Sequence, residues 1–159
     1  MGPALSIIMV NWNAGDVLSS CLKSIYDTLK KPFEVIVVDN KSSDNSVSMV
    51  MNDFPDAKLL KQPENIGFSK ASNIGFRSSL GKYVLFLNPD TVLSECAIDD
   101  MLSFLDNHAE VGIVGPKIID AYGNISKHGK GRLPSVSEDI LSAFLIRRFL
   151  DRIETILFK

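Results

Sequence analysis

Several common nucleotide-site signatures are missing from this chain. No G-x-G-x-x-G follows the first apolar run, where Asn11-Trp12-Asn13-Ala14-Gly15 stands instead, so the usual dinucleotide-binding turn is excluded. Five residues separate Gly75 from Gly81, one more than a phosphate-binding P-loop allows, and Tyr83 replaces its Ser or Thr. The chain therefore shows neither a nicotinamide-binding nor a P-loop pattern.

Cysteine is equally scarce. The two cysteines, Cys21 and Cys96, form no C-x-x-C pair, so neither a disulfide framework nor a zinc site is indicated. Each lies in an apolar helical pattern, and we expect both to be buried thiols. A phospho-receiver domain is also disfavoured, because it needs acidic residues after the first strand and Asn11 and Asn13 stand there.

Neither an excess of basic charge nor a membrane-length apolar run is present. The 17 Lys and Arg are balanced by 19 Asp and Glu, which leaves a formal net charge of -2 and no basic field to hold nucleic acid. No charged segment followed by an apolar stretch opens the chain, and Arg147 and Arg148 interrupt its most apolar late segment, residues 140–150. We expect a cytoplasmic protein, at most peripheral to the inner face of the membrane, that has no nucleic acid partner.

Apolar runs of strand length alternate with segments of helical period. This alternation predicts βαβ units, and therefore an α/β fold with a mostly parallel, Rossmann-like sheet flanked by helices. The 159 residues are enough for one packed core. The predicted strands are Leu5–Val10, Phe33–Val38, Lys58–Leu60, Tyr83–Leu87 and Val111–Ile119, and the predicted helical stripes are Leu18–Leu29, Val47–Phe54 and Ile98–Leu105, the last capped by Ser94 with Glu95 in its first turn.

Polar side chains follow four of the predicted strands. These clusters are Asn11–Asn13, Asp39–Asp44, Asn65–Ser69 and Asn88–Asp90. Ligands of parallel α/β sheets bind outside the carboxyl ends of the strands, so all four clusters should face one crevice.

Each cluster alone has a structural explanation. Asp39 could cap the helix predicted near Ser43, and Asn13 or Asp16 could cap the first helix. Caps need one residue per loop, whereas these loops carry two or three polar residues each. Together the clusters therefore predict a ligand site.

Asp90 is the clearest metal-ligand candidate. Its carboxylate follows a strand and a turn stiffened by Pro89, and carboxylate oxygen suits Mg²⁺ or Mn²⁺. Such sites use one or two protein carboxylates and leave the remaining positions to water and phosphate oxygens. A diphosphate ligand is implied.

The motifs resemble those of family 2 glycosyltransferases, in their rhamnosyltransferase-like branch. The similarity runs from Leu5 to about Ser135 and includes an NPD form of the family's DxD motif at Asn88-Pro89-Asp90. It covers the N-terminal, nucleotide-sugar-binding part of the family's GT-A fold. The other matching segments are Ser6–Asn13, Glu34–Ser46, Asn65–Phe76, Leu87–Thr91, Val114–Lys117 and Arg132–Ser135.

The resemblance implies roles for individual residues. Asp39 matches the acid that accepts a hydrogen bond from a pyrimidine ring, Asn88 matches the first DxD position near the ribose or sugar, and Asp90 matches the metal-binding position. The remaining implied nucleotide-sugar-binding residues are Val10, Asn11 and Asn13 around base and ribose, Asn40 and Pro89, and Asn65, Gly67 and Lys70 in a loop that closes over the nucleotide.

The implied function is inverting transfer of a sugar from a UDP- or dTDP-sugar, with dTDP-rhamnose as one candidate donor, in cell-surface polysaccharide synthesis. The acceptor would be a glycan or a lipid-linked molecule, and Mg²⁺ or Mn²⁺ would be the cofactor. No catalytic base is identified, because the family's base lies in a later motif and Glu138-Asp139 reads as the first turn of a helix. The alternative is a nucleotide-sugar-binding module that transfers nothing.

The C-terminal part of the chain carries a separate prediction. We expect a nucleotide-sugar-binding domain over residues 1–135, and an amphipathic helical segment over residues 136–159 that begins an acceptor-binding half missing from the chain. The segment's apolar stripe would favour self-association, or contact with a membrane surface through Arg147, Arg148 and Arg152. The stripe consists of Ile140, Phe144, Leu145, Phe149, Ile153 and Leu157.

Overall fold

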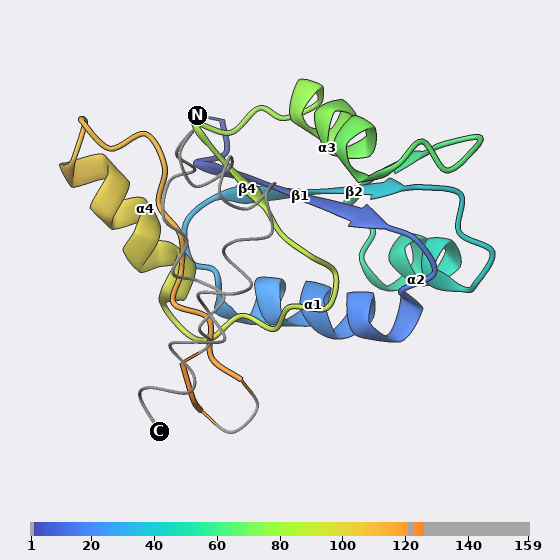
Figure 1. Ribbon diagram of the computed structural model, residues 1–159, viewed down its shortest axis with the longest axis horizontal. Helices are drawn as coiled ribbons and strands as arrows, with labels where there is room; N and C mark the ends of the chain where they lie inside the picture. The colour runs from blue at the N-terminus through green and yellow to red at the C-terminus, as the bar shows by residue number, and fades with distance from the viewer. Residues whose placement is uncertain (1, 121–122, 126–159) are drawn as a thin grey trace, which may run out of the picture. The chain divides into compact units, whose positions relative to one another are not determined.

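The structure is a computed structural model that describes residues 2–120 and 123–125. The chain divides into two compact units, Met1–Pro116 and Lys117–Lys159. The first unit contains four strands and four helices (Figure 1). They are β1 (Leu5–Asn11), α1 (Gly15–Thr28), β2 (Phe33–Asp39), α2 (Ser46–Asp53), β3 (Lys58–Lys61), α3 (Phe68–Arg77), β4 (Tyr83–Phe86) and α4 (Ala97–Asn107).

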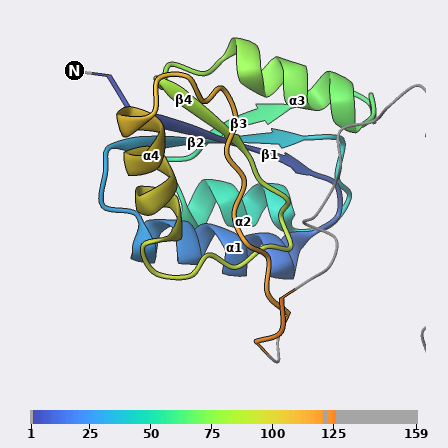
Figure 2. The same cartoon turned by 60° about the vertical axis from the view of Figure 1, so that its left-hand side comes forward.

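The sheet is parallel throughout, with strand order β3-β2-β1-β4. Helices α1 and α2 lie on one face and α3 on the other, while α4 lies beside β4 (Figures 1 and 2). Because the strands are parallel, the loops that follow them leave the same edge of the sheet. The predicted α/β fold, with its parallel sheet flanked by helices, is confirmed.

Both faces of the central strands are apolar, as covering helices require. Alternate residues of β1 and β2, such as Met9 and Val37, pack with Leu22 and Ile25 of α1. The intervening residues Ile36 and Val38 pack against Ala71 of α3. Each fully buried large side chain contributes roughly 1.5 to 3 kcal/mol of hydrophobic stabilisation. This two-sided core fixes the register of β1 and β2.

Helix α3 is absent from the helices predicted from sequence. Its buried face consists of Ala71, Ser72 and Gly75, whereas Phe68 and Phe76 are more than half exposed. A Cβ at Gly75 would lie 2.4 Å from Cγ2 of Ile8, so the helix backbone packs directly on the sheet. A search for large apolar residues at helical spacing misses a helix that is buried through small ones.

The strand predicted at Val111–Ile119 is wrong. Within the described residues this segment forms only one isolated antiparallel bridge, between Ile119 and Ile125. A strand needs a neighbour that pairs with its backbone, and β4 pairs with β1 in the described sheet. Apolar composition alone therefore did not make this segment a strand.

The predicted start of α4 is also wrong. Ser94 does not cap the helix, which begins at Ala97 after Cys96 in a left-handed conformation with φ of 63°. Cys96 is exposed, contrary to the prediction, whereas Cys21 is buried as predicted.

At the other end of α4, the Asp106 carboxylate accepts hydrogen bonds from Lys82, Tyr83 and Lys31, and these donors lower the pKa of Asp106 to about 2.

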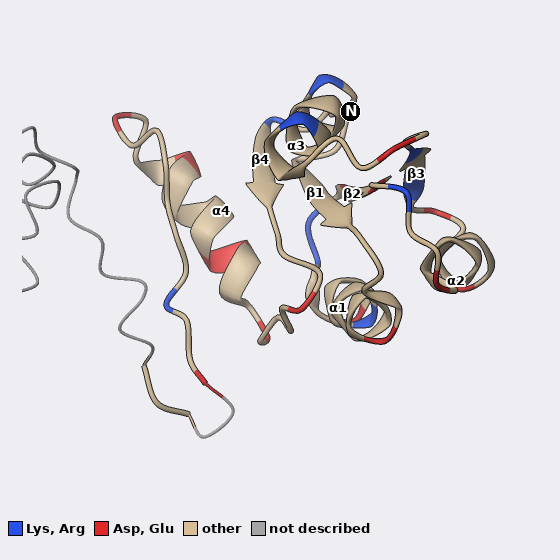
Figure 3. Cartoon of the chain, turned by 45° about the vertical axis from the view of Figure 1, so that its right-hand side comes forward, with Lys and Arg blue, Asp and Glu red and all other residues tan. Residues whose placement is uncertain are grey.

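Charged residues of both signs are scattered over the helices, strands and loops of the first unit (Figure 3). No helix within residues 2–120 and 123–125 is long and apolar enough to span a bilayer. The predicted boundary at residues 135/136, the acidic pair Glu138-Asp139 and the C-terminal apolar stripe lie outside the described residues.

One packing prediction concerns Gly81, in the turn between α3 and β4. A Cβ there would lie 2.5 Å from the backbone nitrogen of Ser6 and 2.7 Å from the carbonyl carbon of Leu5, neither of which can rotate away. Gly81→Ala should lower the free energy of unfolding by about 1 to 3 kcal/mol, as overpacking does. Gly112→Ala is the matched control, since a Cβ there meets nothing within 4 Å. Equal denaturation midpoints for the two variants would contradict the packing.

Candidate functional site

The candidate site is built where β1 and β2 end. Asn11 and Asp39 are register partners on the two strands, and they are 1% and 3% exposed. The Asn11 amide nitrogen lies 2.9 Å from Oδ1 of Asp39, 2.9 Å from Oγ of Ser42 and 2.7 Å from Oγ of Ser46. A carboxylate oxygen can only accept, so the amide nitrogen must face Asp39. Asn11 thus joins β1 to the loop and the helix that follow β2.

A second set of hydrogen bonds joins the loop after β1 to the loop after β2. Oδ1 of Asn13, a residue with φ of 53°, accepts from the backbone nitrogen of Ser43 at 2.7 Å. The Asn13 backbone nitrogen donates to Oγ of Ser42 at 2.9 Å. The exchange in both directions fixes the two loops relative to each other.

Asp44 extends this connection to both helix starts. Its oxygens accept from the backbone nitrogens of Gly15 at 3.0 Å and Ser46 at 3.1 Å, and the Ser46 hydroxyl donates to it as well. Desolvation opposes the charged form of Asp44, but these donors outweigh it and hold the pKa below its usual value. Asp44, from another loop, therefore supplies the acceptor for the first amide of α1.

These contacts decide the capping alternatives. Oδ2 of Asp39 accepts from the backbone nitrogen of Ser42, before the helix begins at Ser46, so Asp39 is not a helix cap. Asn13 bonds to Ser43 and not to α1, and Asp16 lies inside the first turn of that helix. These residues bond one loop to another and cap neither helix, and the ligand site stays a prediction.

The loop after β3 is held by Asn40. Its amide nitrogen donates to Oδ1 of Asn65 at 2.8 Å, and its Oδ1 accepts from the backbone nitrogen of Ile66 at 3.0 Å. Oδ1 of Asn65 also accepts from Gly67, whose φ of 81° suits glycine. Lys70 is exposed in the first turn of α3. Asn40, Asn65 and Gly67 are thus brought together.

The remaining predicted residues are placed differently. Val10 is half-buried and packs against the apolar cluster on the α3 face of the sheet. Asn88 and Asp90 are exposed on a turn after β4, in which the Thr91 backbone nitrogen bonds to the Asn88 carbonyl at 3.2 Å. Pro89 lies between them and is half-buried.

The Asp90 carboxylate is available for a ligand. No hydrogen bond or ion pair to it is found among the described residues, and those residues hold no group of three or more His, Cys, Asp or Glu that could bind a metal ion. Asp90 therefore fits a cation whose other ligands come from outside the protein, as Mg²⁺ and Mn²⁺ bound with diphosphate require.

Burial raises the pKa of the nearby Cys21 thiol to about 11, and the charge of Asp90 adds to the rise. Cys21 is therefore a neutral hydrogen-bond donor.

Trp12 was not among the predicted site residues. It is 60% exposed, between Asn11 and Asn13, and it is the single tryptophan of the chain. Large aromatic side chains are usually buried, so an exposed one beside a polar loop is informative. The aromatic residue within the polar sequence Asn11-Trp12-Asn13 was the signal that could have revealed it.

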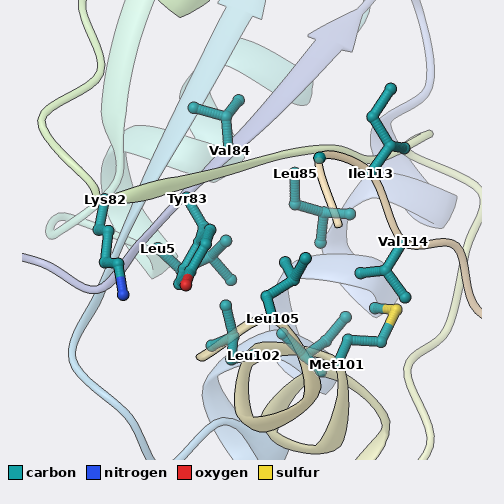
Figure 4. A pocket seen from close by; sticks show the side chains of 12 residues that line it. Leu5, Lys82, Tyr83, Val84, Leu85, Met101, Leu102, Leu105, Ile113 and Val114 are labelled. Carbon is teal, nitrogen blue, oxygen red and sulfur yellow. The ribbon is translucent and has the colours of Figure 1, made fainter. Parts of the chain in front are cut away.

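An apolar pocket of about 300 Å³ lies apart from these loops, between β4, α4 and residues 112–114 (Figure 4). Side chains including Leu85, Leu102 and Val114 line it. Its polar residues are Lys82 and Tyr83, both of which are bonded to Asp106. The pocket lacks the converging polar groups of a nucleotide site. Another pocket, of about 310 Å³, opens at the loops themselves and is lined by Asn13–Val17, Asp44 and Asn45.

The family model described as Glycosyl transferase family 2 matches residues 6–155. The chain belongs to this family. The resemblance seen in the motifs is thereby confirmed, and so is the GT-A fold. Among solved structures of the fold, the crystal structure of S. aureus TarS 1-349 in complex with UDP-GlcNAc matches with a TM-score of 0.61 and 26% identity, over 69% of this chain and 32% of that one.

Two curated members of the family cover nearly the whole chain. GalNAc(5)-diNAcBac-PP-undecaprenol beta-1,3-glucosyltransferase of Campylobacter jejuni is 30% identical over 92% of this chain and 49% of its own length. N-acetylglucosaminyl-diphospho-decaprenol L-rhamnosyltransferase of Mycobacterium tuberculosis is 25% identical over 91% of this chain and 50% of its own length. The chain thus spans about half the length of these relatives.

A prediction for this family 2 site is that Asn11 holds its loops together. Asn11→Ala leaves the buried Asp39 carboxylate without its side-chain donor, and it should lower the free energy of unfolding by about 2 kcal/mol or more. Asn52→Ala, at an exposed position of α2, is the control and should change it by no more than about 0.5 kcal/mol. Urea denaturation of both variants measures the difference. A loss for Asn11→Ala no larger than the control's would contradict this role.

Proposed function

We propose that the chain binds a nucleoside-diphosphate sugar at the carboxyl edge of its sheet, and that the protein transfers the sugar to a glycan or lipid-linked acceptor. The observation that carries the proposal is the set of cross-bonded loops after β1, β2 and β3, with Trp12 and Asp90 exposed after β1 and β4. Rigid loops with exposed aromatic and carboxylate groups suit a ligand that has a base at one end and a diphosphate at the other.

The base and ribose would occupy the edge formed by β1 and β2. Each Asp39 oxygen accepts one hydrogen bond within the protein, and a carboxylate oxygen has room for a second. The remaining lone pairs can accept the ring N–H of a pyrimidine. Trp12 offers a flat surface on which a base can stack. Asn11 would act by holding the loop after β2, Val10 would support the end of β1 by packing on the α3 side, and Asn13 would lie at the edge of the base and ribose site.

The diphosphate would lie at the carboxyl end of β4, next to β1 in the sheet. Asp90 would hold Mg²⁺ or Mn²⁺, with Asn88 near the ribose or sugar and Pro89 stiffening the turn between them. When bound, the ion stabilises negative charge on the departing diphosphate. Asn65, Gly67 and Lys70, in the loop that Asn40 holds after β3, would close over the nucleotide.

The comparisons support a proposal for the donor and the setting. TarS binds UDP-GlcNAc, and the two curated relatives are named for lipid-linked diphosphate acceptors. A UDP- or dTDP-sugar, with dTDP-rhamnose as one candidate, and inverting transfer in cell-surface polysaccharide synthesis are therefore proposed here. A cytoplasmic location, peripheral to the inner face of the membrane, is part of the proposal, as is self-association or membrane contact through residues 136–159.

Trp12 gives a direct test of the proposed function. Because it is the single tryptophan and lies at the site, binding of UDP with Mn²⁺ should change the intrinsic fluorescence, and GDP should bind more weakly than UDP. A transfer assay with the cognate donor then separates an enzyme from a binding module without turnover. Fluorescence that does not respond to any of UDP, TDP and GDP with Mn²⁺ would contradict the proposal.

Asp90→Ala tests the metal assignment. In this variant, the increase in UDP affinity on adding Mn²⁺ should be at least about tenfold smaller than in the unmodified protein. The Asp90 carboxylate is the only protein ligand proposed for the ion. Its unfolding should stay cooperative, since the side chain is exposed. Asp27→Ala, an exposed aspartate on α1, is the control. If UDP binding to Asp90→Ala kept its full dependence on Mn²⁺, the assignment would be wrong.

A further inference from the structure

Helix α1 contacts the segment that carries Asp90, at Asn88 and at Leu93. The Ser24 hydroxyl donates to the Cys21 carbonyl at 2.7 Å, and its oxygen accepts from the backbone nitrogen of Leu93 at 3.1 Å. The Cys21 sulfur lies 3.7 Å from the carbonyl oxygen of Asn88 and 3.6 Å from the sulfur of Met9 in β1. The two side chains therefore hold the segment that contains Asp90 at a point on either side of it.

The geometry of Ser24 suits this task. Its single hydroxyl hydrogen is donated to the Cys21 carbonyl, so its oxygen can take part in a further hydrogen bond only as an acceptor. The amide of Leu93 meets that oxygen, and the Leu93 side chain packs against the main core cluster. The backbone after Asp90 is thus fixed by one polar bond and one apolar contact.

The neighbouring hydroxyls of α1 make a useful comparison. Ser20 and Thr28 also donate to carbonyls within the helix, to Asp16 at 3.2 Å and to Ser24 at 2.7 Å. Among the described residues, Ser24 is the one of the three whose oxygen also accepts from a segment outside α1. Its contact with the turn is therefore more than ordinary bonding of a serine to its own helix.

We propose that Ser24, assisted by Cys21, is a positioning residue that fixes the Asp90 turn, so that α1 sets the distance between the metal ligand and the nucleotide loops. Helix α1 can do so because its first amide is bonded to Asp44 in the loop after β2. One rigid element is then attached to both halves of the site. This inference rests on the proposed function and names the residue on which the metal-dependent part of that function depends.

The test compares UDP affinity with and without Mn²⁺ in the 159-residue chain, followed through Trp12 fluorescence. Ser24→Ala should reduce the Mn²⁺-dependent gain in affinity by about threefold to tenfold, the scale of one hydrogen bond, while metal-free UDP affinity stays unchanged. Ser20→Ala is the matched control, with the same substitution one turn earlier on the same helix. Ser24→Thr, which keeps the hydroxyl, should restore the gain.

Hydrogen exchange at the Leu93 amide supplies a readout that does not require metal. Exchange should quicken in Ser24→Ala and stay unchanged in Ser20→Ala. An unchanged Mn²⁺ gain in Ser24→Ala, or an equal loss in Ser20→Ala, would overturn the inference. If the unmodified chain binds UDP without any dependence on Mn²⁺, the metal part of the proposed function fails instead. The Leu93 exchange rate then decides by itself whether Ser24 holds the turn: quickened exchange supports the anchor, and unchanged exchange overturns it.

Discussion

The candidate site depends on one buried hydrogen bond, from the Asn11 amide to the Asp39 carboxylate. It forms at the last register pair of β1 and β2, where two residues of adjacent parallel strands face each other at the sheet edge. A buried carboxylate is costly unless donors surround it. Asp39 receives them from Asn11 and from the backbone of Ser42. The need to satisfy this charge therefore fixes the loop after β2, and the loops after β1 and β3 bond to that loop.

The site also depends on a sheet that is buried on both faces. Residues of β1 and β2 alternate between the α1 side and the α3 side, and both sets are apolar. A slip of one residue along either strand would move its buried side chains to the opposite face and separate Asn11 from Asp39. Apolar packing thus sets the register, and the register places the polar pair that organises the site.

Much of this arrangement could be predicted from the sequence, for physical reasons. Long apolar runs fixed the position of β1 and β2, and parallel strands put their polar ends at one edge. Helix α3 escaped prediction because Gly75 and Ala71 bury backbone instead of large side chains. Val111–Ile119 was predicted as a strand because apolar composition carries no information about a pairing partner. The double role of Asp44 depends on two loops that meet only after folding.

The proposed metal site contains one protein carboxylate, that of Asp90. Asn88 is an amide where a second carboxylate would add negative charge, so Asp90 alone would face a divalent ion there. One exposed carboxylate competes poorly with water for such an ion, whereas a diphosphate adds several oxygens and further charge. The ion and the nucleotide should therefore bind together. Because the ligand would supply most of the coordination, the protein would contribute one correctly placed oxygen, and this placement depends more on a rigid turn than on many protein ligands.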